Sequence, residues 1–192
     1  MFIQTESTPN PQTLKFLPGR VVLENGTAEF LEPNEAGARS RLAGKLMAID
    51  GVTGIFFGYD FITVTKDETN WAHLKPAILA AIMEHFLSGE PVMAPHAAGA
   101  APSDSGEEFF EEGDEAVVST IKELLDTRVR PAVAQDGGDI TFRGFRDGVV
   151  FLNMRGSCAG CPSSTATLKH GIENLLRHFV PEVEAVEAME AA

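Results

Sequence analysis

A stretch rich in proline, alanine and acidic residues divides this chain of 192 residues into two short halves. Residues 89–113 contain six Asp and Glu residues and no Lys or Arg, so −6 of the formal net charge of −13 lies there. Such a segment buries too little apolar surface to offset the entropy lost on ordering. We therefore predict a flexible acidic linker between small domains at 1–88 and 114–192, with Phe109-Phe110 as an apolar spot for docking on a neighbouring domain.

The first half carries helix and strand signals but no cysteine. The periodicity predicts strands at 2–5, 13–17 and 20–23, a helix over 35–49, a hairpin of strands at 52–57 and 61–65, and a last helix from Trp71 to Phe86 that Asn70 caps. We expect Trp71 to lie in the core, and His73 and His85 to be packing or surface residues rather than ligands. The half is predicted to be a small α+β domain.

The second half has the element order α-β-β-loop-α. Its predicted elements are a helix that Asp114 caps and that ends before Pro131, a turn at 136–139, a strand through Ile140 and Phe142, a tight turn at Asp147-Gly148, a strand at 149–154, and a helix that Pro162 begins. The inward face of that last helix is predicted to hold Leu168, Ile172, Leu175 and Phe179. Both halves therefore predict the α+β fold class.

The charge balance disfavours two classes of partner. With 15 Lys and Arg against 28 Asp and Glu, the chain has no basic stripe for nucleic acid and no attraction to anionic membranes. It also has no apolar run near the roughly 20 residues of a membrane span. The first residues lack the pattern of a signal or transit peptide, so we expect a bacterial cytoplasm, with a processed form in the mitochondrial matrix as the alternative.

Cys158 and Cys161 are the only two cysteines, in the sequence Cys-Ala-Gly-Cys-Pro at the end of a predicted strand. Two thiols are half of the four ligands that a structural zinc ion or an iron–sulfur cluster needs. Gly156 and Gly160 allow the loop to curl around a bound atom. The following helix presents its amino end to Cys161, which favours the thiolate.

Several uses of the pair remain open from the residues alone: a cluster shared by two chains, a zinc ion shared by two chains, a redox dithiol, or unligated thiols. Thioredoxin-like dithiols commonly carry proline between the cysteines, whereas Pro162 follows them here. Zinc bound within one chain is disfavoured because His170 and His178 lie nine and seventeen residues beyond Cys161.

The surrounding residues carry a resemblance to a known family. Gln135–Ile140 followed by Gly156–Ser164 closely resembles the C-terminal domain of NifU-like proteins, the Nfu iron–sulfur cluster carriers. Motifs within residues 1–19, and residues 58–65, resemble the N-terminal domain of the same carriers. Both sets stand in the expected order and cover most of the chain outside the linker.

The resemblance implies that Cys158 and Cys161 bind a [4Fe-4S] cluster at the interface of two C-terminal domains, as a homodimer with two ligands from each chain. It implies a carrier rather than an enzyme, with an upstream cluster donor and apo iron–sulfur proteins as partners. Gly160, through backbone N–H groups, and Arg155 are expected to support the anionic cluster. The turn at 136–139 matches the family too, but we expect it to act only as a turn. The cysteine-free first half is expected to recognise or stabilise client proteins.

Overall fold

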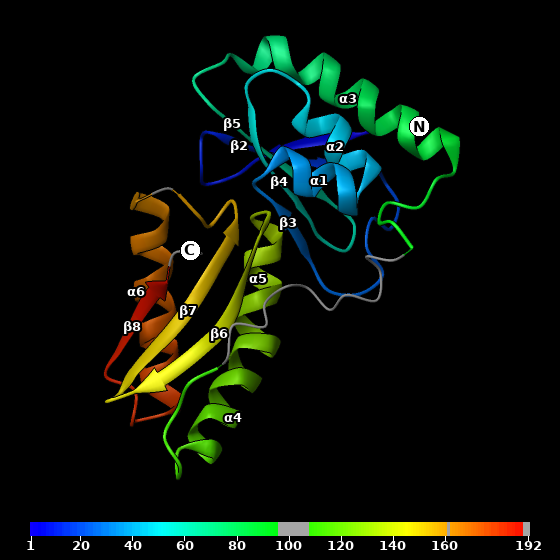
Figure 1. The fold of residues 1–192 in the computed structure, drawn as a ribbon. Helices are drawn as coiled ribbons and strands as arrows, with labels where there is room; N and C mark the ends of the chain where they lie inside the picture. Colours follow the sequence, from blue (N-terminus) through cyan, green and yellow to red (C-terminus); the bar gives the residue numbers. More distant parts are fainter. Residues whose placement is uncertain (96–107, 161, 190–192) are drawn as a thin grey trace. The chain divides into compact units, whose positions relative to one another are not determined.

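The computed structural model describes residues 1–95, 108–160 and 162–189, without the side chains of residues 162–164. The chain divides into two compact units, Met1–Asp104 and Ser105–Ala192. Each unit combines helices with its own sheet (Figure 1). The predicted α+β class is confirmed.

The N-terminal unit is built on an antiparallel sheet of five strands in the order β1-β2-β5-β4-β3. Its elements are β1 (Gln4–Ser7), β2 (Thr13–Leu17), β3 (Ala28–Phe30), α1 (Pro33–Arg39), α2 (Arg41–Met47), β4 (Val52–Phe57), β5 (Ile62–Lys66) and α3 (Trp71–Ser88). One buried cluster joins the sheet to the helices, and its members include Phe16, Phe57, Leu42, Leu46, Ile78 and Ile82. The central hairpin and the last helix agree with the sequence prediction.

The strand predicted at 20–23 is wrong. The backbone N–H groups of Val22 and Leu23 both donate to the carbonyl of Tyr59, at 2.7 and 3.2 Å, instead of joining a ladder. The strand β3, which pairs with β4, forms one edge of the sheet.

The single helix predicted over 35–49 is also wrong, because Ser40 interrupts it with extended backbone angles. The Ser40 hydroxyl accepts a hydrogen bond from the N–H of Ala43 at 3.1 Å and donates one to the carbonyl of Val92 at 2.6 Å. Ser40 therefore caps α2, and the local side-chain bonds of serine outweigh the helical periodicity around it.

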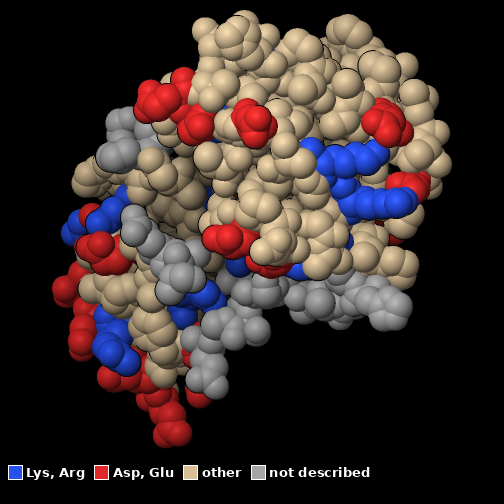
Figure 2. Space-filling model, turned by 45° about the horizontal axis from the view of Figure 1, so that its top comes forward, with Lys and Arg blue, Asp and Glu red and all other residues tan. Residues whose placement is uncertain are grey.

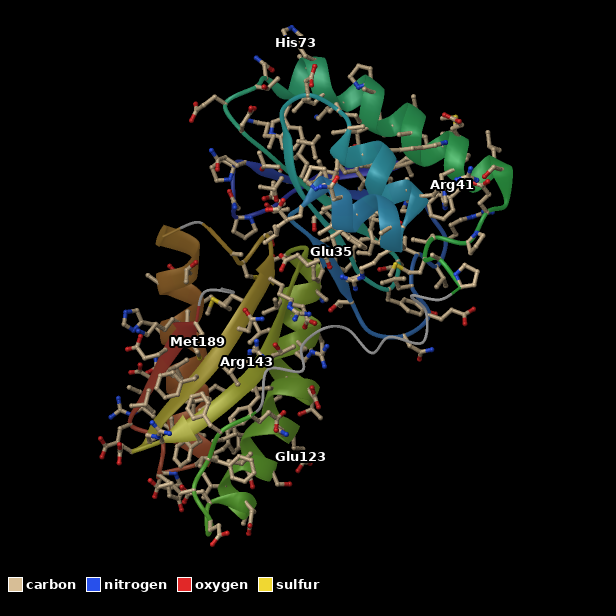
Figure 3. The ribbon with its side chains drawn as sticks, in the orientation of Figure 1. Glu35, Arg41, His73, Glu123, Arg143 and Met189 are labelled. Carbon is tan, nitrogen blue, oxygen red and sulfur yellow. The ribbon has the colours of Figure 1, made fainter. Side chains whose placement is uncertain are left out.

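The start of α3 confirms the predicted cap, since Asn70 Oδ1 accepts from the N–H of Ala72 at 2.9 Å. Trp71 is only partly buried, and its indole N–H donates to the carbonyl of Pro11 at 3.3 Å. His73 is exposed and projects away from α3 (Figure 3). His85 is fully buried at the other end of the same helix.

The C-terminal unit has a sheet of three strands in the order β6-β7-β8. Its elements are α4 (Glu115–Leu124), the π-helical turn η1 (Leu125–Val129), α5 (Arg130–Gln135), β6 (Gly138–Arg146), β7 (Val149–Gly156), α6 (Pro162–Phe179) and β8 (Ala185–Met189). One buried cluster includes residues of both helical segments and of all three strands. The α4–α5 segment and α6 therefore cover the same face of the sheet (Figure 1).

One prediction for this unit holds, two are wrong, and one strand was missed. Asp147 and Gly148 both have positive φ, 51° and 76°, as a tight hairpin turn requires. The first helix does not end before Pro131 but continues through the wide turn η1, which accommodates a residue without an N–H group. The parallel strand β8 was not predicted. Phe179 is 46% exposed instead of facing inward, while Leu176 is fully buried.

Phe109 pairs with the sheet of the C-terminal unit. Its N–H donates to the carbonyl of Arg143 at 3.2 Å, and its carbonyl accepts from the N–H of Phe145 at 2.8 Å. The Phe109 ring lies 5.2 Å from the ring of Phe151. Phe109 thus forms a short parallel bridge alongside β6, opposite Gly144. Residues 96–107 of the predicted linker lie outside the described residues.

Basic and acidic side chains are mixed on the face that Figure 2 draws, with no continuous basic area of the kind that binds a phosphate backbone. In the N-terminal unit, for example, Arg41 pairs with Glu90, and Lys45 pairs with Glu84. None of the helices in the described ranges combines the length and apolar character that a membrane crossing requires.

His85 gives the N-terminal unit a predicted pH dependence. Both ring nitrogens lack a hydrogen-bond partner, and burial lowers the pKa of the imidazole below its ordinary 6.5, with Lys45 and Arg41 adding to the effect and Glu90 opposing it. As the pH drops below about 6.5, His85 therefore binds a proton in the unfolded chain but stays neutral in the folded chain. The free energy of unfolding of the N-terminal unit falls accordingly.

We expect His85→Leu to reduce the loss of stability between about pH 7.5 and pH 5.5. The fluorescence of Trp71, the only tryptophan, reports urea unfolding of this unit directly. His73→Leu is the matched control because His73 is exposed. Equal pH dependence in the wild type and the His85 variant would contradict the assignment.

Candidate metal centre

Cys158 lies in a tight turn between β7 and α6. Gly156 and Gly160 on either side have φ values of 63° and 77°, which residues with a side chain rarely adopt. The N–H of Ala159 donates to the carbonyl of Gly156 at 3.1 Å, and the hydroxyl of Thr165 in α6 donates to the carbonyl of Cys158 at 3.1 Å. The cysteine is thus fixed to both elements that it joins.

The same turn is tied to the turn that precedes β6. The Ser157 hydroxyl donates to the carbonyl of Asp136, and the Ser157 N–H donates to the carbonyl of Gly137 at 3.3 Å. Gly137 has a φ of 82°, so the turn predicted from its two glycines is present. It serves a second purpose that the sequence analysis did not assign, since it holds the backbone next to the cysteine.

Gly138 contacts Cys158 directly. A Cβ atom placed on Gly138 would lie 2.5 Å from the Cys158 Sγ atom and 2.8 Å from the carbonyl oxygen of Arg155. Only 6% of Cys158 is exposed, and the residue belongs to the apolar core of the unit. The lack of a side chain at Gly138 provides the space in which the sulfur lies.

An ion pair fixes the first residues of β6. Arg130 donates from Nε and Nη2 to the two carboxylate oxygens of Asp139, at 2.8 and 2.9 Å, and from Nη1 to Asp126 at 3.0 Å. The Asp139 side chain is only 5% exposed. Hydrogen bonding to Asp139 raises the pKa of the Arg130 guanidinium above its ordinary value despite the opposing effect of burial. Because Asp139 follows Gly138, this pair holds the strand against which the sulfur packs.

Burial raises the pKa of the Cys158 thiol to about 11, and the nearby carboxylates of Asp136 and Asp139 add to that rise. A hydrogen bond with Ser157 acts in the opposite direction. In this conformation the sulfur is therefore a protonated thiol at neutral pH. Binding a metal requires the sulfur to lose this proton.

The other residues predicted for the site are placed differently. Gly160 is exposed beside Cys158, whereas Arg155 is buried in β7 directly across from Asp139. Cys161 lies outside the described residues. His170 and His178 are exposed on α6, and within the described part of the chain no group of three or more His, Cys, Asp and Glu side chains could hold a metal ion.

Comparison with known families matches both units. Residues 3–89 match the family described as "Scaffold protein Nfu/NifU N terminal", and residues 121–187 match the "NifU-like domain". A human relative named "NFU1 iron-sulfur cluster scaffold homolog, mitochondrial" is 54% identical over 189 residues, which cover 97% of this chain and 71% of the relative. The chain belongs to the Nfu/NifU family.

A plant relative agrees with this membership. "NifU-like protein 4, mitochondrial" from Arabidopsis thaliana is 52% identical over 191 residues, covering 97% of this chain and 65% of that protein. This Nfu/NifU chain thus spans between 65% and 71% of the length of these two relatives. A solved NifU-like protein from Saccharomyces cerevisiae is 29% identical, covers 50% of this chain and 86% of its own, and superposes with a TM-score of 0.43.

The expectation of a bacterial cytoplasm is wrong. The relatives at about 50% identity over 97% of this chain are named as mitochondrial proteins, in human, plant and fly. A transit peptide is removed on import, so the lack of a transit-peptide pattern in a sequence does not decide between these two compartments.

Replacing Arg130 tests the ion pair. We expect Arg130→Lys to lower the free energy of unfolding of the C-terminal unit by about 2 kcal/mol, because lysine keeps the charge but cannot make the two parallel hydrogen bonds to Asp139. Urea unfolding followed by far-ultraviolet circular dichroism measures the change. The control is Arg177→Lys, because the Arg177 side chain is 56% exposed and makes a single contact of 3.5 Å with Glu173, and there we expect less than about 0.5 kcal/mol. Equal losses of unfolding free energy in both variants would show that the Arg130 pair stabilises the unit no more than a surface pair does.

Proposed function

We propose that this protein is a carrier of iron–sulfur clusters that holds one [4Fe-4S] cluster between two chains and passes it to apo-proteins. Cys158 and Cys161 of each chain would be the four ligands. Membership of the Nfu/NifU family supports the scaffold or carrier role. The observation that carries the bridged arrangement is the thiol count, since a cluster held by cysteine needs four thiolates and the chain has two.

The residues around Cys158 suit such a cargo. Thiolates are the ligands that iron–sulfur clusters prefer. Gly156 and Gly160 shape a turn that exposes backbone beside the sulfur, and the amino end of α6, an 18-residue helix, begins at Pro162. Free N–H groups and the positive end of the helix dipole would stabilise the negative charge of the bound cluster. The role proposed for Gly160 follows from this, while Arg155 would act from the neighbouring strand.

Binding and release are balanced steps without a change of oxidation state. As each iron–sulfur bond forms, the cysteine thiol gives its proton to solvent, and the thiolate binds iron. Release reverses the step, when a client's thiolates replace the carrier's and the freed sulfur takes up a proton. Half of the ligands lie on each chain in this arrangement, so separation of the chains weakens the hold on the cluster and dimerisation strengthens it.

A redox dithiol is the rival function, and Cys158 argues against it. A reactive thiol is accessible and has a lowered pKa, whereas Cys158 is buried and its pKa is raised to about 11. A zinc ion bridged between two chains uses the same four thiolates, and metal analysis distinguishes it from a cluster. We therefore favour the non-enzymatic carrier.

The partners follow from the proposed role. The carrier needs a donor that supplies clusters and apo iron–sulfur proteins that accept them. The N-terminal unit contains no cysteine, so we assign it to recognition or stabilisation of clients rather than to a second cluster site.

Removing either thiol tests the ligand assignment. We expect Cys158→Ser and Cys161→Ser each to lose the cluster, because one substitution in both chains of a dimer removes two of four ligands. Iron and sulfide analysis after anaerobic reconstitution measures the loss. Circular dichroism is the control for folding, since a hydroxyl replaces a thiol of similar size. A single variant that keeps its full iron and sulfide content would refute the assignment.

A further inference from the structure

The backbone angles of Gly138 do not explain why a glycine stands next to Cys158. The φ angle of Gly138 lies outside the left-handed region, so a residue with a side chain could adopt its backbone conformation. The obstacle is space, because the added Cβ would lie 2.5 Å from Sγ, 2.8 Å from the carbonyl oxygen of Arg155 and 3.2 Å from the Cys158 nitrogen. Glycine is therefore required here by close packing, with the sulfur as the nearest atom, and not by its own backbone conformation.

The sulfur lies in a recess formed by Gly138 and the apolar core of the unit, and we call this the thiol recess. Cys158 is 6% exposed in it, although the neighbouring Gly160 is exposed. Hydrogen bonds from Ser157 to Gly137 and from Thr165 to Cys158 hold the backbone on both sides. The inward position of the sulfur is thus a packed state with several supports.

This position conflicts with ligation by a second chain. A sulfur that binds a cluster shared with another chain must reach the surface, whereas the thiol recess places it in the core. The carrier proposed above therefore requires two positions of the sulfur: the buried one that the structure shows, which we call stored, and an exposed one, which we call displayed. A ligand that binds only the displayed position has its affinity reduced by the fraction of molecules in the stored position.

We propose that Gly138 is a positioning residue whose thiol recess competes with the cluster for the Cys158 sulfur and so promotes release of the cargo. This inference rests on the carrier function proposed above. On release the iron–thiolate bond breaks, the sulfur takes a proton from solvent, and the neutral thiol returns to the recess with no change in oxidation state. A displaced sulfur would remain available to bind the cluster again.

The first experiment needs no cluster. In a Cys161→Ser background only Cys158 remains, and its alkylation by N-ethylmaleimide at fixed pH is followed by mass spectrometry. We expect Gly138→Ala to speed alkylation by about tenfold or more, because the added methyl group displaces the sulfur from the recess. Gly144→Ala is the matched control, because Gly144 lies in the same strand as Gly138. A Cβ atom on Gly144 would also lie 2.5 Å from its nearest neighbour, which is the Phe109 ring. Equal rates in the Gly138 variant and its parent would overturn the proposal.

A second measurement keeps the proposal testable if Gly138→Ala does not fold. The parent with Cys158 alone is alkylated in its native state and in urea at the same pH. The thiol recess predicts protection by about a hundredfold or more, and protection below about tenfold would refute it.

A third experiment, on the rate of cluster loss, tests this inference separately from the carrier function. With both cysteines present, we expect Gly138→Ala to slow loss of the reconstituted cluster to EDTA by about threefold or more, with no such change in Gly144→Ala. Faster alkylation with unchanged cluster loss would refute the competition. Failure of the wild type to bind a cluster would refute the carrier function, while the alkylation arm would still decide whether the recess exists.

Discussion

The position of one sulfur atom depends on contact between two turns that are far apart in sequence. The start of β6 supplies Gly138, the turn before it supplies the carbonyls that bind Ser157, and the turn after β7 supplies Cys158. The ion pair of Arg130 with Asp139 fixes the first of these turns, and Thr165 ties the second to α6. The environment of Cys158 is thus set by tertiary packing in the C-terminal unit rather than by its own loop.

Burial and ligation place opposite demands on that sulfur, and a carrier makes use of both. A site with four cysteines in one folded core would retain its cluster, because nothing in the fold would favour release. In the proposed carrier, two half-sites on separate chains could part, and a stored position for the thiol would give each half-site a stable state without cargo. Both features would lower the affinity for the cluster, as delivery to an apo-protein requires.

The sequence predicted those elements that local interactions determine. The β4–β5 hairpin, the Asn70 cap and the Asp147-Gly148 turn depend on neighbouring residues, and the structure confirms them. The short strand β8 was missed because it exists through parallel pairing with β7. The contact between Gly138 and Cys158 was missed for the same reason: the turn motif explained its own glycines, and nothing local indicated a sulfur twenty residues away.

Anaerobic reconstitution with iron and sulfide, followed by size exclusion with light scattering, visible absorption and iron analysis on one peak, tests the central claim most directly. The account predicts a coloured dimer with about four irons per two chains, as one bridged [4Fe-4S] cluster requires. A coloured monomer with its own full cluster would contradict the shared site. A colourless monomer with two titratable thiols would contradict the carrier function itself.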